Sequence, residues 1–86
     1  MGKAVSDLTL DEKHFARQQA SAKASDVLLK IRRERGLSQA QLAEVSGRKQ
    51  SYISRVESRQ QNISLGTLQE IVNSVGAELI IDVDLH

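Results

Sequence analysis

The side chains best suited to chemistry in this chain are its lysines and arginines, which gather in the middle of the sequence. Residues 21–60 hold nine Lys and Arg against four Asp and Glu, whereas residues 61–86 hold four Asp and Glu and no Lys or Arg. The formal charge of +1 for the whole chain hides this division. Positive charge concentrated in this way suits a phosphate backbone. For the basic run 30–35 taken alone, a solvated helical surface is the alternative interpretation.

The chain contains few residues suited to catalysis or to metal binding. It has no cysteine, and its two histidines, His14 and His86, lie at opposite ends of the sequence. Together with scattered carboxylates they form neither a zinc cluster nor a set of nucleophile, base and orienting residue, and there is no glycine-rich phosphate loop. We therefore expect no enzyme activity, no metal, no cofactor and no small-molecule substrate.

The nature of a nucleic-acid target follows from the scarcity of aromatic residues. Phe15 and Tyr52 are the only two, so stacking platforms for single-stranded DNA or RNA are not expected and the target should be a duplex. The start of the chain lacks an apolar stretch of signal-peptide length, and no segment approaches the roughly 18 apolar residues of a membrane span. We expect a soluble cytoplasmic protein without a membrane partner.

The elements that position these side chains are predicted to be helical, because apolar residues recur at three and four positions until Gly76. Glycines suited to left-handed caps and serines suited to N-caps divide the chain into four to five short helices. The predicted helices run from near Ala22 to Gly36, from Ser38 to Gly47, from Lys49 to Glu57 and from Ser64 to Gly76. Their expected core residues are Leu28, Ile31, Leu42, Ala43, Val45, Ile53, Val56, Leu65, Leu68, Ile71, Val72 and Val75.

The C-terminal residues follow a different pattern, an alternation that predicts a half-buried strand over residues 77–86. Leu79, Ile81 and Val83 share one face of this strand. One strand cannot satisfy its own backbone groups, and no other segment has the pattern of a partner. We therefore expect a homodimer in which two such strands pair antiparallel about a two-fold axis and bury this stripe, which would also supplement the small core of 86 residues. A last amphipathic helix is the competing interpretation.

A motif at residues 37–58, LSQAQLAEVSGRKQSYISRVES, places two short helices on either side of a turn that contains Gly47. The small side chain of Ala43 allows the two helices to cross closely. With the preceding IRRERG and the following helix, this segment resembles the Cro/repressor-like (XRE) helix-turn-helix family over roughly residues 24–76. Leu-Ser-Gln, Leu-Ala, the turn glycine and Ile-Ser-Arg-Val-Glu occur at the spacings of that family. The resemblance implies a lambda-repressor-like bundle that binds double-stranded DNA.

By this resemblance, the helix over residues 49–57 is the recognition helix, whose exposed face enters the major groove. Ile53 and Val56 must face the core, which leaves its polar residues exposed. Glutamine can pair with adenine and arginine with guanine, each contributing about 1–3 kcal/mol of discrimination. The expected base-contacting residues are Gln50, Ser51 and Arg55, with Lys49 and Ser54 as second choices.

The resemblance also places phosphate contacts at the start of the first motif helix, at the turn and in the loop after the recognition helix. The expected phosphate-contacting residues are Gln39, Arg48, Tyr52, Arg59, Gln61 and Asn62. Tyr52 has an equal alternative, packing of its ring against the domain. The family usually has glycine at the position of Ser58 and proline at that of Ile63, so this loop departs from its pattern.

Arg32 and Glu57 are expected to form a partly buried salt bridge, because related domains pair an arginine of the first helix with the glutamate that closes the recognition helix. Such a pair would orient the recognition helix, and loss of one partner can cost several kcal/mol. Contact of Arg32 with a phosphate is the alternative.

The biological role depends on the parts outside the shared domain, which divide the chain into a leader (1–20), a helix-turn-helix domain (21–76) and a dimerisation strand (77–86). The strand residues Gly-Ala-Glu-Leu-Ile-Ile resemble those of HigA- and HipB-type antitoxins, which repress their own toxin–antitoxin operon. The leader is then a candidate toxin-binding segment or simply a leader helix, and the acidic strand face is another candidate. The alternatives are a stand-alone XRE regulator of the phage-repressor or restriction-modification controller type, and a protein-binding adaptor.

Overall fold

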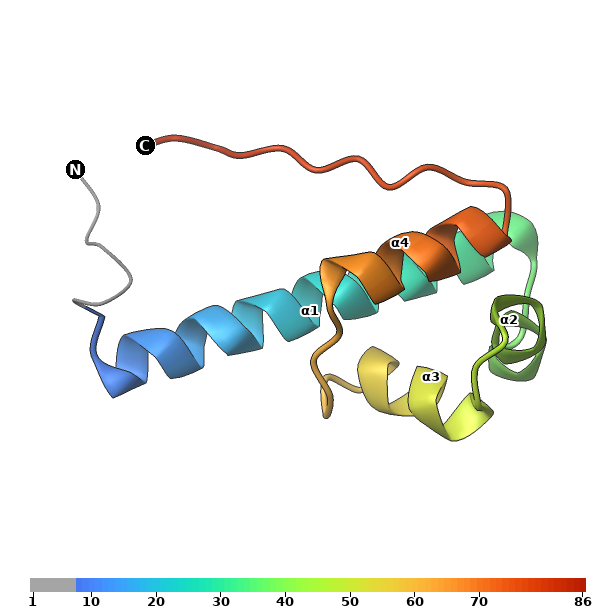
Figure 1. Ribbon diagram of the computed structural model, residues 1–86, viewed down its shortest axis with the longest axis horizontal. Coiled ribbons are helices and arrows are strands. Elements are labelled where there is room, and N and C mark those ends of the chain that lie inside the picture. The colour runs from blue at the N-terminus through green and yellow to red at the C-terminus, as the bar shows by residue number, and fades with distance from the viewer. Residues whose placement is uncertain (1–7) are drawn as a thin grey trace.

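The computed structural model describes residues 8–86 and shows a bundle of helices followed by an extended C-terminal segment (Figure 1). The helices are α1 (Leu10–Arg35), α2 (Gln39–Ser46), α3 (Gln50–Glu57) and α4 (Leu65–Ser74). The prediction of a mainly α fold is confirmed, with four helices in this part of the chain. None of these helices is long and apolar enough to cross a membrane.

Helix α1 is a single helix of 26 residues that begins at Leu10, so the predicted start near Ala22 was wrong. A capping box fixes its beginning: the Thr9 hydroxyl accepts a hydrogen bond from the Glu12 N–H at 3.1 Å, and the Glu12 carboxylate accepts one from the Thr9 N–H at 3.2 Å. Buried residues begin only at Ser21. The apolar periodicity therefore marks where α1 joins the core. The helix itself begins earlier, because its N-terminal turns are stabilised by the capping box and by residues with high helix propensity.

The core lies between the C-terminal half of α1 and the three short helices. Each helix contributes a large residue with no exposed surface: Leu28, Leu42, Ile53 and Ile71. The other buried apolar residues are Ala24, Ile31, Ala43, Val56, Leu68 and Val72. Two predicted core residues are exposed instead, Val45 at 51% and Leu65 at 63%, because α2 and α4 each turn only part of their apolar residues inward.

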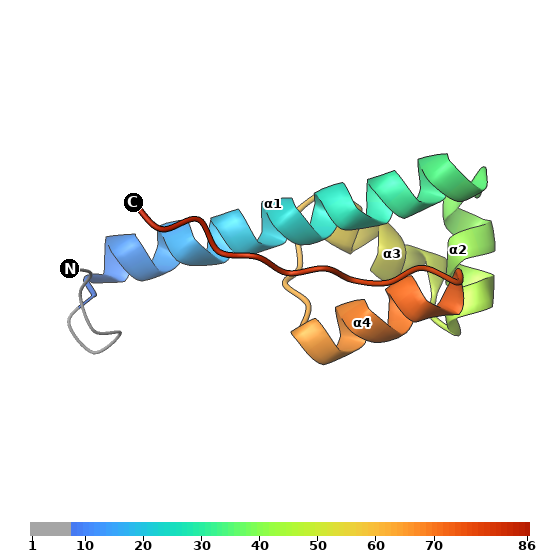
Figure 2. The ribbon, with the colours of Figure 1, turned by 90° about the horizontal axis from the view of Figure 1, so that it is seen from above.

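The long axis of the molecule is set by α1. Helices α3 and α4 pack against its C-terminal half, α2 packs against α3 and α4, and the N-terminal half of α1 projects beyond them (Figures 1 and 2). The overall extents are 42 × 24 × 18 Å. Residues on the projecting half are consequently exposed, including Leu10 at 84% and Phe15 at 60%.

The C-terminal segment, residues 77–86, is extended and runs back towards the N-terminal end of α1 (Figure 2). The predicted strand is not supported, since no strand occurs between residues 8 and 86. The physical reason is the one that the sequence already raised: an extended segment needs a second strand to bond its backbone groups. Leu79 packs against the core, whereas Ile81 is 61% and Val83 70% exposed.

Candidate nucleic-acid interface

A tight turn connects helices α2 and α3. Ser38 caps α2 by accepting a hydrogen bond from the Gln41 N–H at 3.1 Å. At the other end Gly47 has φ 69°, a left-handed conformation that an L side chain rarely adopts, and the Arg48 N–H bonds to the Ala43 carbonyl at 2.9 Å. The chain thus reverses sharply between α2 and α3, as a helix-turn-helix requires.

The predicted base-contacting residues share the outer surface of α3 because Ile53 and Val56, both without exposed surface, attach its other face to the core. Four of the five are exposed, and Ser54 is half-buried. The exposed residues are Lys49, Gln50, Ser51 and Arg55. The structure therefore brings polar hydrogen-bonding side chains to one short helix that stands at the surface.

Arg55 is oriented by the loop that follows α3. Its Nε donates a hydrogen bond to Gln61 Oε1 at 2.8 Å. A guanidinium has five N–H donors in a planar fork, so this bond leaves the terminal nitrogens as donors to another group. The contact joins a predicted base-contacting residue to a predicted phosphate-contacting residue, a pairing that the sequence did not indicate.

The start of α3 differs from the starts of the other helices. Thr9, Ser38 and Ser64 each cap a helix through a side-chain hydrogen bond, whereas Lys49, the N-cap residue of α3, makes none. The first N–H groups of a helix have no partner within the helix. At α3 they lie beside the exposed Gln50 and Ser51.

Glu57 ties three helices together at the far end of α3. Its Oε1 accepts from Arg32 Nη1 of α1 at 2.7 Å and from Gln39 Nε2 of α2 at 2.9 Å. The Ser25 hydroxyl donates to its backbone carbonyl at 2.5 Å. The Glu57 side chain is only 6% exposed and that of Arg32 24%. The arginine and the carboxylate thus form a largely buried ion pair that fixes α3 relative to α1 and α2.

The three predicted phosphate-contacting residues that lie on α2, at the turn and on α3 all have partners inside the protein. The Gln39 amide bonds to Glu57, and Arg48 Nη2 lies 2.6 Å from Glu70 Oε2 of α4. The Tyr52 ring packs against the core, which is the second of its two interpretations. Gln39 keeps a second amide hydrogen, whereas the positive charge of Arg48 is offset by Glu70.

The loop between α3 and α4 takes an unusual course at Arg59. This residue has φ 65°, and among residues 8–86 it is the one residue other than glycine with a positive φ. The Gln60 N–H bonds to the Arg55 carbonyl at 2.9 Å and the Arg59 N–H to the Val56 carbonyl at 3.1 Å. The left-handed position of a helix C-terminal cap is therefore taken by arginine, and Ser58, where the family usually has glycine, has φ −86°.

The loop is fastened to α1 at its other end, where the Ser21 hydroxyl bonds to the Asn62 side-chain oxygen. Neither Ser21 nor Ser25 was singled out from the sequence. Both are polar residues at positions where the helical period calls for burial, and this is the signal that could have found them.

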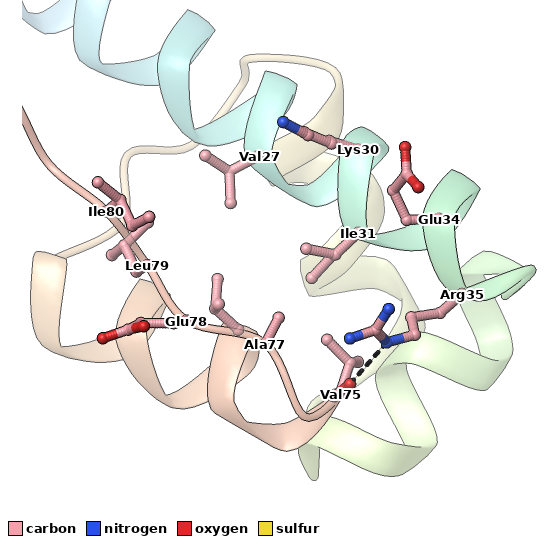
Figure 3. A pocket seen from close by; sticks show the side chains of 11 residues that line it. Val27, Lys30, Ile31, Glu34, Arg35, Val75, Ala77, Glu78, Leu79 and Ile80 are labelled. Atoms are coloured by element: carbon pink, nitrogen blue, oxygen red, sulfur yellow. Dashed lines mark hydrogen bonds between the residues drawn. The ribbon is translucent and has the colours of Figure 1, made fainter.

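The C-terminal segment closes a pocket of about 530 Å³ between α1 and α4 (Figure 3). Val27 and Ile31 of α1 line one side of it, and Ala77, Leu79 and other residues that follow α4 line the opposite side. Arg35 holds the chain at this point, donating to the carbonyls of Val75 at 2.9 Å and Gly76 at 3.3 Å. The predicted dimerisation stripe is thus split in this single chain, with Leu79 inward and Ile81 and Val83 outward.

Within residues 8–86, no three His, Cys, Asp or Glu side chains lie close enough together to hold a metal ion. The polar surface formed by α2, α3 and the following loop carries hydrogen-bond donors and positive charge, which suit an anionic ligand.

Comparison with known proteins supports this geometry. The structure is similar to the restriction-modification controller protein C.Esp1396I, with a TM-score of 0.63, 32% sequence identity and coverage of 69% of this chain and 76% of that one. It is equally similar, with a TM-score of 0.63 and 32% identity over 69% of this chain and 78% of that one, to the same controller protein as a tetramer in complex with its natural 35 base-pair operator. No curated protein matches. A helix-turn-helix family profile matches residues 28–79, and the chain therefore belongs to the helix-turn-helix family.

Proposed function

We propose that this chain is a sequence-specific regulator of transcription that binds double-stranded operator DNA as a homodimer. The observation that carries the proposal is the construction of α3, in which Ile53 and Val56 are fully buried while Gln50, Ser51 and Arg55 are exposed. A short helix held in this way can enter the major groove and present hydrogen-bond donors to base edges. The similarity to a controller protein that binds its operator supports the same conclusion.

In this proposal, Arg55 reads guanine and Gln50 reads adenine, with Ser51 beside them and Lys49 and Ser54 as further contacts. The bond from Arg55 Nε to Gln61 limits the freedom of the arginine before DNA arrives, which lowers the entropy cost of binding. Backbone contacts fix the register of α3 on the duplex. The proposed phosphate-contacting residues are Gln39, Arg48, Tyr52, Arg59, Gln61 and Asn62, with Arg48 weakened by its ion pair with Glu70.

This assignment can be tested by selecting binding sites from a pool of random duplex DNA. We expect one palindromic sequence to be enriched by the wild-type chain. Arg55→Ala should lose preference at one base position of each half-site, by about tenfold to a hundredfold, because a bidentate arginine contributes about 1–3 kcal/mol of discrimination. Lys23→Ala, which removes an exposed cation from α1, is the control and should select the wild-type sequence.

Two results would count against the proposal. Failure to enrich any sequence would exclude sequence-specific recognition and favour an adaptor role on the same fold. An Arg55→Ala profile identical to that of the wild type would remove Arg55 from the reading set.

We further propose that dimerisation uses the C-terminal segment, with residues 77–86 of two copies pairing as antiparallel strands. The exposed Ile81 and Val83 support the proposal, as does the backbone of residues 78–86, which makes no hydrogen bond to another backbone group of the described residues. A two-fold dimer would place two copies of α3 about 34 Å apart, one turn of DNA, on a palindromic operator.

Ile81→Asp tests this interface. Two like charges brought together and desolvated at a two-fold axis should convert the dimer to monomers, as measured by light scattering. Ser74→Asp, an exposed position on α4, serves as the charge-matched control and should remain dimeric. A dimer that survives Ile81→Asp would place the interface elsewhere.

Two biological roles fit such a regulator. The first is a stand-alone controller, favoured by the structural similarity to a restriction-modification controller protein. The second is an antitoxin that represses its own operon, for which the apolar C-terminal segment and the exposed Leu10 and Phe15 of α1 offer surfaces for a toxin. Co-expression with the product of the adjacent gene separates the two, because a stable complex that binds the promoter indicates an antitoxin.

A further inference from the structure

The N-terminal half of α1 turns a polar face towards the loop that follows α3. Between them lies a pocket of about 530 Å³. Its lining consists of polar residues alone, none of them acidic: His14, Arg17, Gln18, Ser21, Arg59, Gln60, Gln61 and Asn62. His14, Arg17 and Gln18 come from the segment that the sequence assigned to a leader, Ser21 is the next residue of the pocket along α1, and the last four belong to the loop.

The helical face is formed by regular spacing. His14, Arg17, Gln18 and Ser21 stand at positions i, i+3, i+4 and i+7, which lie on one side of a helix. Ser21 is 7% exposed, and its hydroxyl bonds to the Asn62 side chain. This bond anchors the loop to α1 and sets the distance between the two sides of the pocket.

The pocket combines two positive charges with neutral donors. Arg17 contributes one guanidinium from α1 and Arg59 another from the loop, and side-chain amides line the same pocket. Asp26 approaches Arg59 at 3.9 Å, but both side chains of this pair are more than half exposed, so the charge of Arg59 is only weakly offset. Guanidinium groups beside amides are the donors that bind phosphate oxygens in protein–DNA complexes.

The backbone at Arg59 supports a binding role for this residue. Its φ of 65° belongs to the left-handed region, where glycine is favoured and other residues are strained. Residues in this conformation persist where the surrounding structure fixes them, here through the hydrogen bonds that cap α3, and they are frequent at ligand-binding sites. Arg59 lines the pocket in this conformation.

The pocket is also linked to the recognition helix. Gln61 lines the pocket and accepts the hydrogen bond from Arg55 Nε at 2.8 Å. The loop therefore has Arg55 on one side and the α1 face on the other. A duplex that α3 enters must pass its backbone close to this loop.

We propose that this pocket binds a DNA backbone phosphate beside the sequence read by α3, with Arg17 of α1 and Arg59 of the loop as its charged ligands. This inference rests on the proposed DNA-binding function and extends it, because it gives the projecting half of α1 a role in contacting DNA outside the helix-turn-helix. Arg17 and Arg59 set the affinity for all sequences alike, and Arg55 sets the choice of base.

The test uses the full chain and a duplex of about 30 base pairs, three turns of DNA, that carries the palindrome enriched in the selection described above. Dissociation constants are measured as a function of salt concentration. The logarithm of the binding constant falls linearly with the logarithm of the salt concentration. Each lost phosphate contact reduces the magnitude of this slope by about 0.9 and, at about 0.1 M salt, weakens binding about eightfold. We expect this loss per subunit for Arg17→Ala. Lys23→Ala removes the same charge two residues after Ser21, on another side of α1, and should match the wild type.

Arg59→Gly provides a second, independent readout. Removing the strained arginine should raise Tm by about 5 °C while weakening DNA binding, and a structural role alone would not move these two quantities in opposite directions.

The outcomes separate this inference from the function on which it rests. If the wild type itself fails to bind DNA, the proposed function is wrong. If the wild type binds and Arg17→Ala behaves like Lys23→Ala, the phosphate site is wrong and the DNA-binding function stands. Loss of a co-purifying acidic protein in Arg17→Ala, with DNA affinity unchanged, would assign the pocket to a protein partner and overturn the inference.

Discussion

Replacing Arg32 by alanine is expected to lower the free energy of unfolding by about 3–5 kcal/mol, because it leaves a buried carboxylate without its cation. The Glu57 side chain is 6% exposed, and among residues 8–86 its Oε2 has no hydrogen-bond partner. Only the Gln39 amide would remain to bond to Oε1. In a domain of this size such a loss is a large share of the total stability. Chemical denaturation followed by circular dichroism measures it.

A more exposed arginine–glutamate pair, Arg48 with Glu70, is the control. Arg48 contacts Glu70 at a similar distance, but the Glu70 side chain is 70% exposed. Arg48→Ala should therefore cost only about 0–1 kcal/mol. Equal losses in the two variants would show that burial does not decide the strength of these pairs. A double replacement, Arg32→Met with Glu57→Leu, should recover stability, because it removes both charges together.

Ile53→Ala is expected to cost about 2–5 kcal/mol, since Ile53 is a fully buried residue of α3 and its truncation leaves a cavity. DNA binding should weaken in parallel, because α3 loses the contact that holds it against the core. Val45→Ala on the neighbouring α2 is the matched control. Val45 is 51% exposed, so its truncation should change stability by less than about 0.5 kcal/mol.

Urea denaturation of both variants measures these losses, and the duplex titrations described above measure binding. A stable Ile53→Ala variant with normal DNA affinity would show that the core does not fix the position of α3.

The helix-turn-helix is the part of the fold that the sequence predicts best. Ser38 and Gly47 each occupy a position whose backbone geometry the residue type itself favours, and the structure has both caps. Ile53 and Val56 are buried as the helical period requires. Local chemistry and tertiary packing agree in this segment, so its elements could be predicted almost residue by residue.

The remaining features depend on contacts between segments distant in the sequence. Nothing local in Gln61 indicates that it accepts a bond from Arg55, or in Gln39 that it donates to Glu57. The start of α1 was missed because its first turns bury little apolar surface. The strand prediction depends on a second copy of the chain, which the structure of one copy does not contain.

Because α1 is one continuous helix, an insertion or deletion within it rotates one end of the helix relative to the other. Ser25 and Arg32, which bond to Glu57, and Arg17, which lines the polar pocket, belong to one uninterrupted helix. Each residue of a helix adds about 100° of rotation and 1.5 Å of rise. A single insertion between Arg17 and Ser25 would turn the pocket face away from the loop by more than a quarter of a circle. Only whole turns, three or four residues at a time, would keep the two ends of α1 in phase.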